Sequence, residues 1–238
     1  MLILPIGDIS MTTVINTNVP AIIAKSNMDR VQRELESSIA KLSSGSRINK
    51  ASDDAAGIAV ANRMESQIRG LTMAIRHGKD GQNLVDTADG AQVEISNMLQ
   101  RMRELAVQSS NGTLSTADRT ALQTEAAALE TEITRIAETT TWGGLQLLDG
   151  TFSDADAIVF QAGTNSGATI AVTIPEMTVS AATISYTAAQ TIGSFASAQT
   201  AITQIDAALS GVNEVRGNLG AASNRLDSTI GNLNQIRV

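Results

Sequence analysis

The feature that most constrains this chain is a heptad seam. Apolar residues recur at alternating steps of four and three along residues 84–105: Leu84, Ala88, Ala91, Ile95, Met98, Met102 and Leu105. This spacing draws one stripe down an α-helix and is typical of a coiled coil. Similar stripes run along residues 58–75, 122–136 and 202–233. Only 2% of the residues are aromatic, which suits slim helices with aliphatic cores. The prediction is a mainly α fold, an elongated rod of long antiparallel coiled-coil-like helices.

A small β region interrupts the helical pattern. Residues 168–174 (ATIAVTI) alternate, and together with residues 157–163 (AIVFQAG) across the turn TNSG they predict a β-hairpin. The stretch 178–194 is predicted to be a loop or a weak third strand. The predicted segments are an extension at 1–10, an N-terminal helix at 11–44, a connecting joint at 45–56, rod helices at 57–139, a β-hairpin and loop region at 140–195, and a returning helix at 196–238.

Two glycines, Gly78 and Gly81, separate the stripes of residues 58–75 and 84–105. One long helix that tolerates both glycines is the preferred interpretation, and a tight turn is the alternative. Trp142 is expected to anchor the loop that follows the rod helices.

The polar stretch LSSGSRINKASDDAAG, residues 42–57, could hold a phosphate, a metal ion or no ligand. A phosphate-binding loop needs paired glycines followed by Lys and then Ser or Thr, whereas Lys50 precedes an alanine. Asp53 and Asp54 lack a further carboxylate at ligand spacing. The preferred interpretation is a helix stop at 43–45, then Ser52 as the N-cap of a new helix with both aspartates in its first turn.

Several classes of function are disfavoured by composition. The chain has no cysteine, one histidine (His77) and no HExxH or GxSxG motif, so no catalytic site, metal or cofactor is predicted. A net charge of -7 argues against nonspecific nucleic-acid binding. No apolar run is long enough to span a membrane, and the opening MLILPIGDIS lacks the basic region of a secretory signal. The protein is predicted not to be an enzyme.

Several ordered blocks closely resemble bacterial flagellin. They are VINTNVPAI (14–22), LSSGSRINKASDDAAGIAVANRM (42–64), GLTMAIRHGKDGQNLVDTADGA (70–91), LQRMRELAVQSSNGT (99–113) and IDAALSGVNEVRGNLGAASNRLDSTIGNL (205–233). The resemblance extends from Met11 to about Leu233. It implies a self-assembling, non-enzymatic subunit of the extracellular flagellar filament, which serves motility and is exported unfolded through the flagellar type III apparatus.

The resemblance also implies roles for particular residues. An inner-tube stripe would comprise Val31, Leu35, Ile39 and Leu42. The joint between inner tube and rod would involve Arg47, Ser52, Asp53 and Asp54. Subunit packing or contact with a vertebrate innate immune receptor would involve Arg101, Arg103, Glu104, Leu105, Gln108 and Glu125. The expected partners are other flagellin subunits, the export apparatus, filament cap and junction proteins, and that receptor.

The chain also departs from the family pattern. Only about residues 176–195 occupy the place of the outer variable domains, and the family's final C-terminal helix is lacking. Residues 1–238 are therefore expected to polymerise poorly by themselves. Two alternative functions are a hook–filament junction protein and a secreted ligand that uses the rod to bind a receptor. The complete GLTMAIRHGKDG and QRMRELAVQ blocks favour flagellin.

Overall fold

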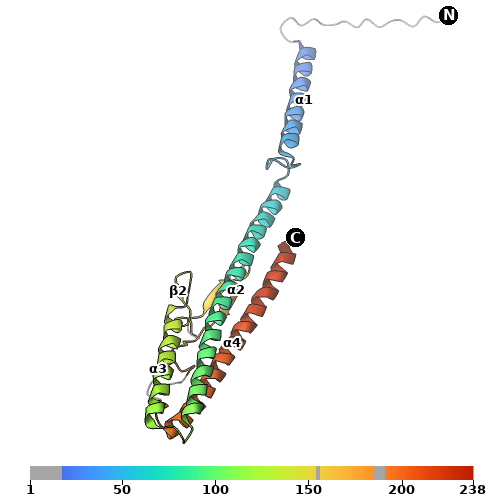
Figure 1. Ribbon diagram of the computed structural model, residues 1–238. Helices are drawn as coiled ribbons and strands as arrows, with labels where there is room; N and C mark the ends of the chain where they lie inside the picture. Colours follow the sequence, from blue (N-terminus) through green and yellow to red (C-terminus); the bar gives the residue numbers. More distant parts are fainter. Residues whose placement is uncertain (1–17, 154–155, 185–190, 238) are drawn as a thin grey trace, which may run out of the picture. The chain divides into compact units, whose positions relative to one another are not determined.

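The computed structural model describes residues 18–153, 156–184 and 191–237. Four helices are described: α1 (Val19–Ser44), α2 (Ala55–Ser109), α3 (Thr116–Thr139) and α4 (Phe195–Arg237). Four short strands are also described: β1 (Thr141–Trp142), β2 (Leu145–Gln146), β3 (Ile158–Gln161) and β4 (Thr169–Val172) (Figure 1). The predicted mainly α class is confirmed. The extension at 1–10 and the first part of the N-terminal helix, residues 11–17, lie outside the described residues.

The chain divides into two compact units, Met1–Glu65 and Ser66–Val238, which we call unit 1 and unit 2. In unit 1, the α1 helix begins after Asn18, whose side chain accepts a hydrogen bond from the backbone N–H of Ala21 at 3.2 Å. The helix ends at Ser44, where Gly45 has φ 66, a left-handed conformation that favours glycine. The helix stop predicted at 43–45 is confirmed.

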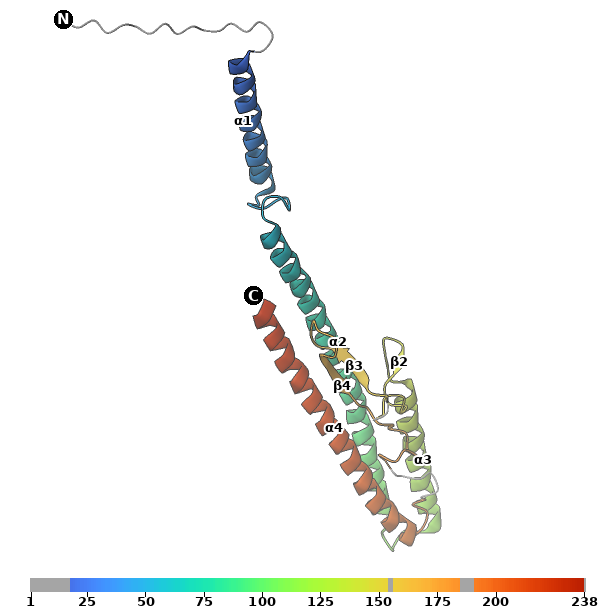
Figure 2. The same cartoon turned by 180° about the vertical axis from the view of Figure 1, so that it is seen from behind.

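In unit 2, α4 runs beside α2 in the opposite direction, and α3 lies along another side of α2 (Figures 1 and 2). The antiparallel arrangement follows from two contacts. Near one end, Leu71 and Ile75 of α2 cluster with Ile230 and Leu233 of α4. Near the other, Arg103 of α2 pairs with Asp206. The first part of α2 thus contacts the last part of α4, and the last part of α2 contacts the first part of α4.

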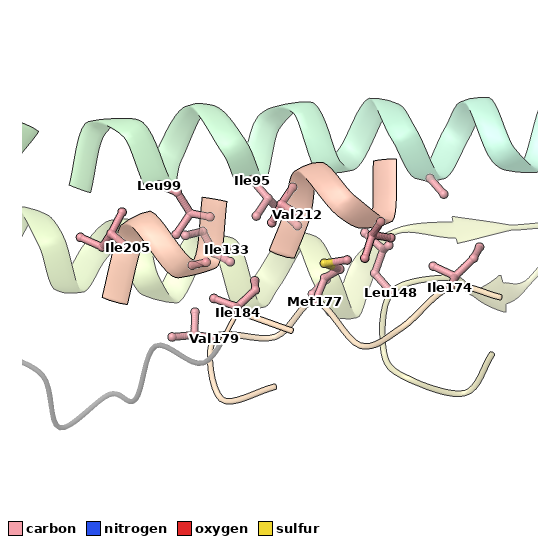
Figure 3. Packing of buried hydrophobic residues seen from close by; sticks show 14 of the residues in the cluster. Ile95, Leu99, Ile133, Leu148, Ile174, Met177, Val179, Ile184, Ile205 and Val212 are labelled. Atoms are coloured by element: carbon pink, nitrogen blue, oxygen red, sulfur yellow. The ribbon is translucent and has the colours of Figure 1, made fainter. Parts of the chain in front are cut away.

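The main core is a continuous cluster of buried aliphatic side chains from all three helices of unit 2. Ile95 and Leu99 of α2 lie against Val212 and Ile205 of α4 and Ile133 of α3 (Figure 3). All of these residues except Leu99 belong to the predicted seams, so their burial explains the spacing. Trp142 is partly buried and packs against this cluster, as expected for an anchor of its loop.

The α2 helix continues through Gly78 and Gly81, so the long helix is confirmed and the tight turn is wrong. A Cβ atom at Gly81 would lie 3.2 Å from Leu226 of α4 and 3.3 Å from the ring of Phe160. Glycine costs about 1 kcal/mol of helix propensity relative to alanine. Here it allows α4 and the β3 strand to approach the α2 backbone closely.

The predicted β-hairpin is confirmed. The β3 and β4 strands pair antiparallel, with Ile158 opposite Val172 and Gln161 opposite Thr169. On β4, Ile170 and Val172 are buried, whereas Thr169 and Ala171 are exposed, so the alternation places one face on the core. A second, shorter pair joins β1 to β2.

Residues 173–184, which we call the strap, form no strand, yet much of this segment lies in the core. Ile174, Met177 and Ile184 are each 0% exposed (Figure 3). The backbone N–H of Met177 donates to the Leu148 carbonyl oxygen at 2.9 Å, and that of Ile174 donates to Phe152 at 2.7 Å. The loop alternative is therefore correct for 178–184, but this loop is a packing element. Residues 185–190 lie outside the described residues.

Candidate functional site

The first candidate surface is the α2 segment RMRELAVQ, residues 101–108. Arg101, Arg103, Glu104 and Gln108 are exposed, because they lie beside the seam rather than in it. Leu105 differs, because only 1% of it is exposed and it belongs to the main core. The expectation that Leu105 contacts a partner directly is therefore wrong. Its position in the α2 seam turns it inward, so it supports the exposed face from beneath.

Ion pairs connect this face to the neighbouring helices. Arg101 donates to Glu104 one turn along α2 at 2.9 Å and contacts Glu125 of α3 at 2.8 Å. These bonds, first that to Glu104, raise the pKa of Arg101. Arg103 contacts Asp206 of α4 at 2.6 Å, and that hydrogen bond lowers the pKa of Asp206. The structure thus joins Arg101 and Glu125, whereas sequence reasoning missed Asp206, because nothing local relates residues so distant in the chain.

All of these pairs are solvent-exposed, so each adds little to stability. Their effect is to hold long side chains in one arrangement on the surface. Beside them, Gln100, Arg103, Glu104, Val107 and Gln108 line a surface hollow of 520 Å³. Val107 is an exposed apolar residue within it. An apolar centre with a polar, pre-arranged border is the general layout of a protein–protein contact.

The second candidate surface is the apolar stripe of α1. Val31, Leu35 and Ile39 are each more than half exposed, and Leu42 is 89% exposed. Within the described residues, no side chain of α1 is buried. An unpartnered apolar stripe of this length is typical of a surface that another helix covers.

The third candidate is the joint between α1 and α2, and here the predicted cap is wrong. The α2 helix begins at Ala55 rather than directly after Ser52. Asp54, not Ser52, takes the N-cap role, because its Oδ1 accepts from the backbone N–H of Gly57 at 2.8 Å. Asp54 also supplies the first backbone acceptor, to Ile58 at 3.1 Å. A carboxylate caps a helix as well as a serine hydroxyl does, so composition alone did not distinguish the two.

Asp53 closes the preceding turn instead of entering the helix. Its Oδ2 accepts from the backbone N–H groups of Asn49 and Lys50, both at 3.1 Å. These bonds, first that from Asn49, lower the pKa of Asp53. Ser52 and Arg47 are exposed. The joint is thus held by its two aspartates acting locally, one on the turn and one on the helix.

The cap assignment predicts unequal effects of two substitutions. Asp54→Ala should unwind the first turn of α2, because the N–H of Gly57 loses its acceptor. Ser52→Ala, the matched control, should leave the turn intact. Backbone chemical shifts of residues 55–58 in the full chain would measure both. A larger loss of helical shifts in the Ser52 variant would contradict the assignment.

Other kinds of site receive no support from the described part of the chain. Among residues 18–153, 156–184 and 191–237, no group of three or more His, Cys, Asp or Glu side chains could hold a metal ion. None of the helices described is both long and apolar enough to cross a membrane.

A family profile and individual relatives of known sequence identify the same protein family. The profile described as "Bacterial flagellin N-terminal helical region" matches residues 15–153. A flagellin of Halalkalibacterium halodurans is 46% identical over 220 residues, which cover 92% of this chain and 79% of that protein. Flagellin E of Vibrio cholerae is 46% identical over 167 residues, 70% of this chain but only 43% of the relative.

A solved structure agrees with these relatives. The crystal structure of Bacillus cereus flagellin matches with a TM-score of 0.57 and 33% identity, covering 66% of this chain and 88% of that one. The chain therefore belongs to the bacterial flagellins, a structural, non-enzymatic family whose subunits form the extracellular filament of the flagellum.

Proposed function

We propose that this chain packs into the flagellar filament through two surfaces, the apolar stripe of α1 and the RMRELAVQ face of α2. The observation that carries the proposal is the stripe of Val31, Leu35, Ile39 and Leu42, whose side chains are more than half exposed. Aliphatic groups that stay in water in the single chain gain about 25 cal/mol per Å² when a partner covers them. Neighbouring flagellin subunits are the partners that family membership supports.

The RMRELAVQ face would contribute specificity more than affinity. Its ion pairs are formed within one subunit, between α2 and α3 and between α2 and α4. A pre-arranged polar border costs less side-chain entropy on association than a mobile one. The hollow around Val107 can then receive an apolar side chain of a neighbouring subunit. Arg101 and Glu125 would be accessible to an immune receptor in an isolated subunit, and that contact stays a prediction.

Delivery to the filament is the second part of the proposal. The chain would travel unfolded through the flagellar export apparatus and fold at the growing end, where filament cap and junction proteins are further expected partners. Support comes from the absence of cysteine, because the chain can then be threaded and refolded without disulfide exchange.

A charge placed in the stripe tests the packing role. Leu35→Asp should strongly reduce incorporation of the tagged chain into filaments, because covering a carboxylate with apolar side chains is unfavourable. The measurement is immunogold electron microscopy of filaments from a host that also makes its own flagellin. Such a host supplies neighbouring subunits.

The matched control is Ser37→Asp, which adds the same charge to a half-exposed position about 200° around α1, away from the stripe. It should be incorporated like the unchanged chain. Equal incorporation of the Leu35 and Ser37 variants would show that the stripe is not a packing surface. If even the tagged chain without substitutions were absent from the filaments, the proposed function itself would be contradicted.

A further inference from the structure

Gln92 is an anomaly in the core of unit 2. It lies on α2 with 0% of its surface exposed. Neither its Oε1 nor its Nε2 atom has a hydrogen-bond partner among the described residues. Ala88 and Ile95, which lie four residues before and three residues after it on α2, are fully buried and apolar. A buried amide without partners is strongly disfavoured relative to an apolar side chain of similar size.

Two interhelical ion pairs show where Gln92 lies along the contact between α2 and α4. Asp89 of α2 contacts Arg216 of α4 at 2.7 Å, and Arg103 contacts Asp206 at 2.6 Å. They align residues 89–103 of α2 with residues 206–216 of α4, and Val212 lies beside Ile95 between them (Figure 3). Gln92 is three residues beyond Asp89 and therefore shares its side of the helix. The unpaired amide consequently lies in the stretch where α4 covers α2.

We propose that Gln92 weakens this stretch of the α2–α4 packing, so that it opens more readily than it would with an apolar residue at position 92. When residues 206–216 separate from α2, the amide gains hydrogen bonds from water that it lacks in the folded state. The ion pairs lost at the same time are partly solvent-exposed, so they resist the opening only weakly. An aliphatic residue at position 92 would have the opposite effect, because its exposure is unfavourable.

The local opening would serve export, and this role rests on the proposed function. A chain that must travel unfolded has to release its longest helix pairing without a high barrier. Each α4 amide that exchanges through this opening reports the free energy of that local step. The opening is thus measurable in the isolated chain, independently of export.

The direct test is amide hydrogen exchange of residues 206–216 in the full chain. Gln92→Met keeps an unbranched side chain of similar length and removes the amide. Exchange of these residues should become about tenfold slower, the effect of relieving one unsatisfied buried polar group. The matched control is Gln67→Met, the same change at an exposed position of α2 outside the proposed contact surfaces, which should leave exchange of 206–216 unchanged.

A second variant keeps the inference testable if methionine packs badly. Gln92→Leu should also slow the exchange, and circular dichroism would confirm that both variants remain helical. Exchange equal to or faster than that of the unchanged chain in both variants would overturn the inference, since the amide would then be stabilising.

A secretion assay tests the role in export separately from the local opening. Secretion of the Gln92→Met chain should be slower than that of the Gln67→Met chain in a flagellated host. Slower exchange with an unaltered secretion rate would overturn the role in export. If no chain were secreted, including the chain without substitutions, the result would instead contradict the proposed function.

Discussion

Gly211→Ala is expected to destabilise unit 2, although alanine is the better helix former. A Cβ atom at Gly211 would collide with the backbone carbonyl oxygen of Thr183 in the strap. A backbone atom cannot move aside as the end of a flexible side chain can, so the strap or α4 must shift. Overpacking of this kind typically costs about 1–3 kcal/mol, more than the gain of about 1 kcal/mol in helix propensity.

Gly217→Ala is the matched control, because it makes the same change six residues further along α4. A Cβ atom there would meet nothing within 4 Å, so only the propensity term remains. This variant should be more stable by about 0.5–1 kcal/mol. Urea unfolding followed by circular dichroism measures both free energies. If the Gly211 variant gained stability as the Gly217 variant does, the close approach of strap and helix would be wrong.

Met177→Ala should have the larger effect on the free energy of unfolding, a loss of about 2–5 kcal/mol. Met177 is 0% exposed and lies among residues of α4 and the loop before the hairpin (Figure 3). Removing its side chain leaves a cavity that the strap can close only in part, because the N–H of Met177 is bonded to Leu148. Urea unfolding of the full chain would measure the loss.

Met73→Ala serves as the control for the loss of a methionine. Met73 is 43% exposed on α2, so its truncation creates no closed cavity and should change stability by less than about 1 kcal/mol. Similar losses in the two variants would mean that the strap contributes no more to the core than an exposed helix position does.

Much of the helical architecture could be predicted from the sequence because its signals are local. The seam from Leu84 to Leu105 repeats every three or four residues, so a single helix face explains it. The hairpin was predictable for the same reason, since Ile170 and Val172 alternate with Thr169 and Ala171 and the turn TNSG precedes them. Both predictions depend on residues close together in the chain.

The strap could not be predicted in this way. Its buried apolar residues, among them Ile174, Met177, Val179, Ala181 and Ile184, are spaced by three, two, two and three positions. This spacing matches neither a helix nor a strand throughout. The segment is ordered by surroundings that come from distant parts of the chain, and those surroundings exist only once the helices have packed.

The candidate site shows the same division. Exposure of Arg101, Arg103, Glu104 and Gln108 followed from their positions beside the seam, and Leu105 could have been excluded on that ground. The N-cap was predicted at Ser52 but lies at Asp54, because both residue types cap helices and only backbone geometry distinguishes them. Asp206 became part of the surface through a contact between two helices.

The sequence by itself therefore determined the helices, the hairpin and the family, since short-range periodicity and ordered motifs carry that information. Only the tertiary structure decided which polar groups meet and which remain alone. Arg103 found Asp206 on α4, whereas Gln92 was buried without a partner among the described residues. The physical reason is that hydrogen bonds and ion pairs extend over a few ångströms in space, and the order of residues in a chain does not specify that proximity.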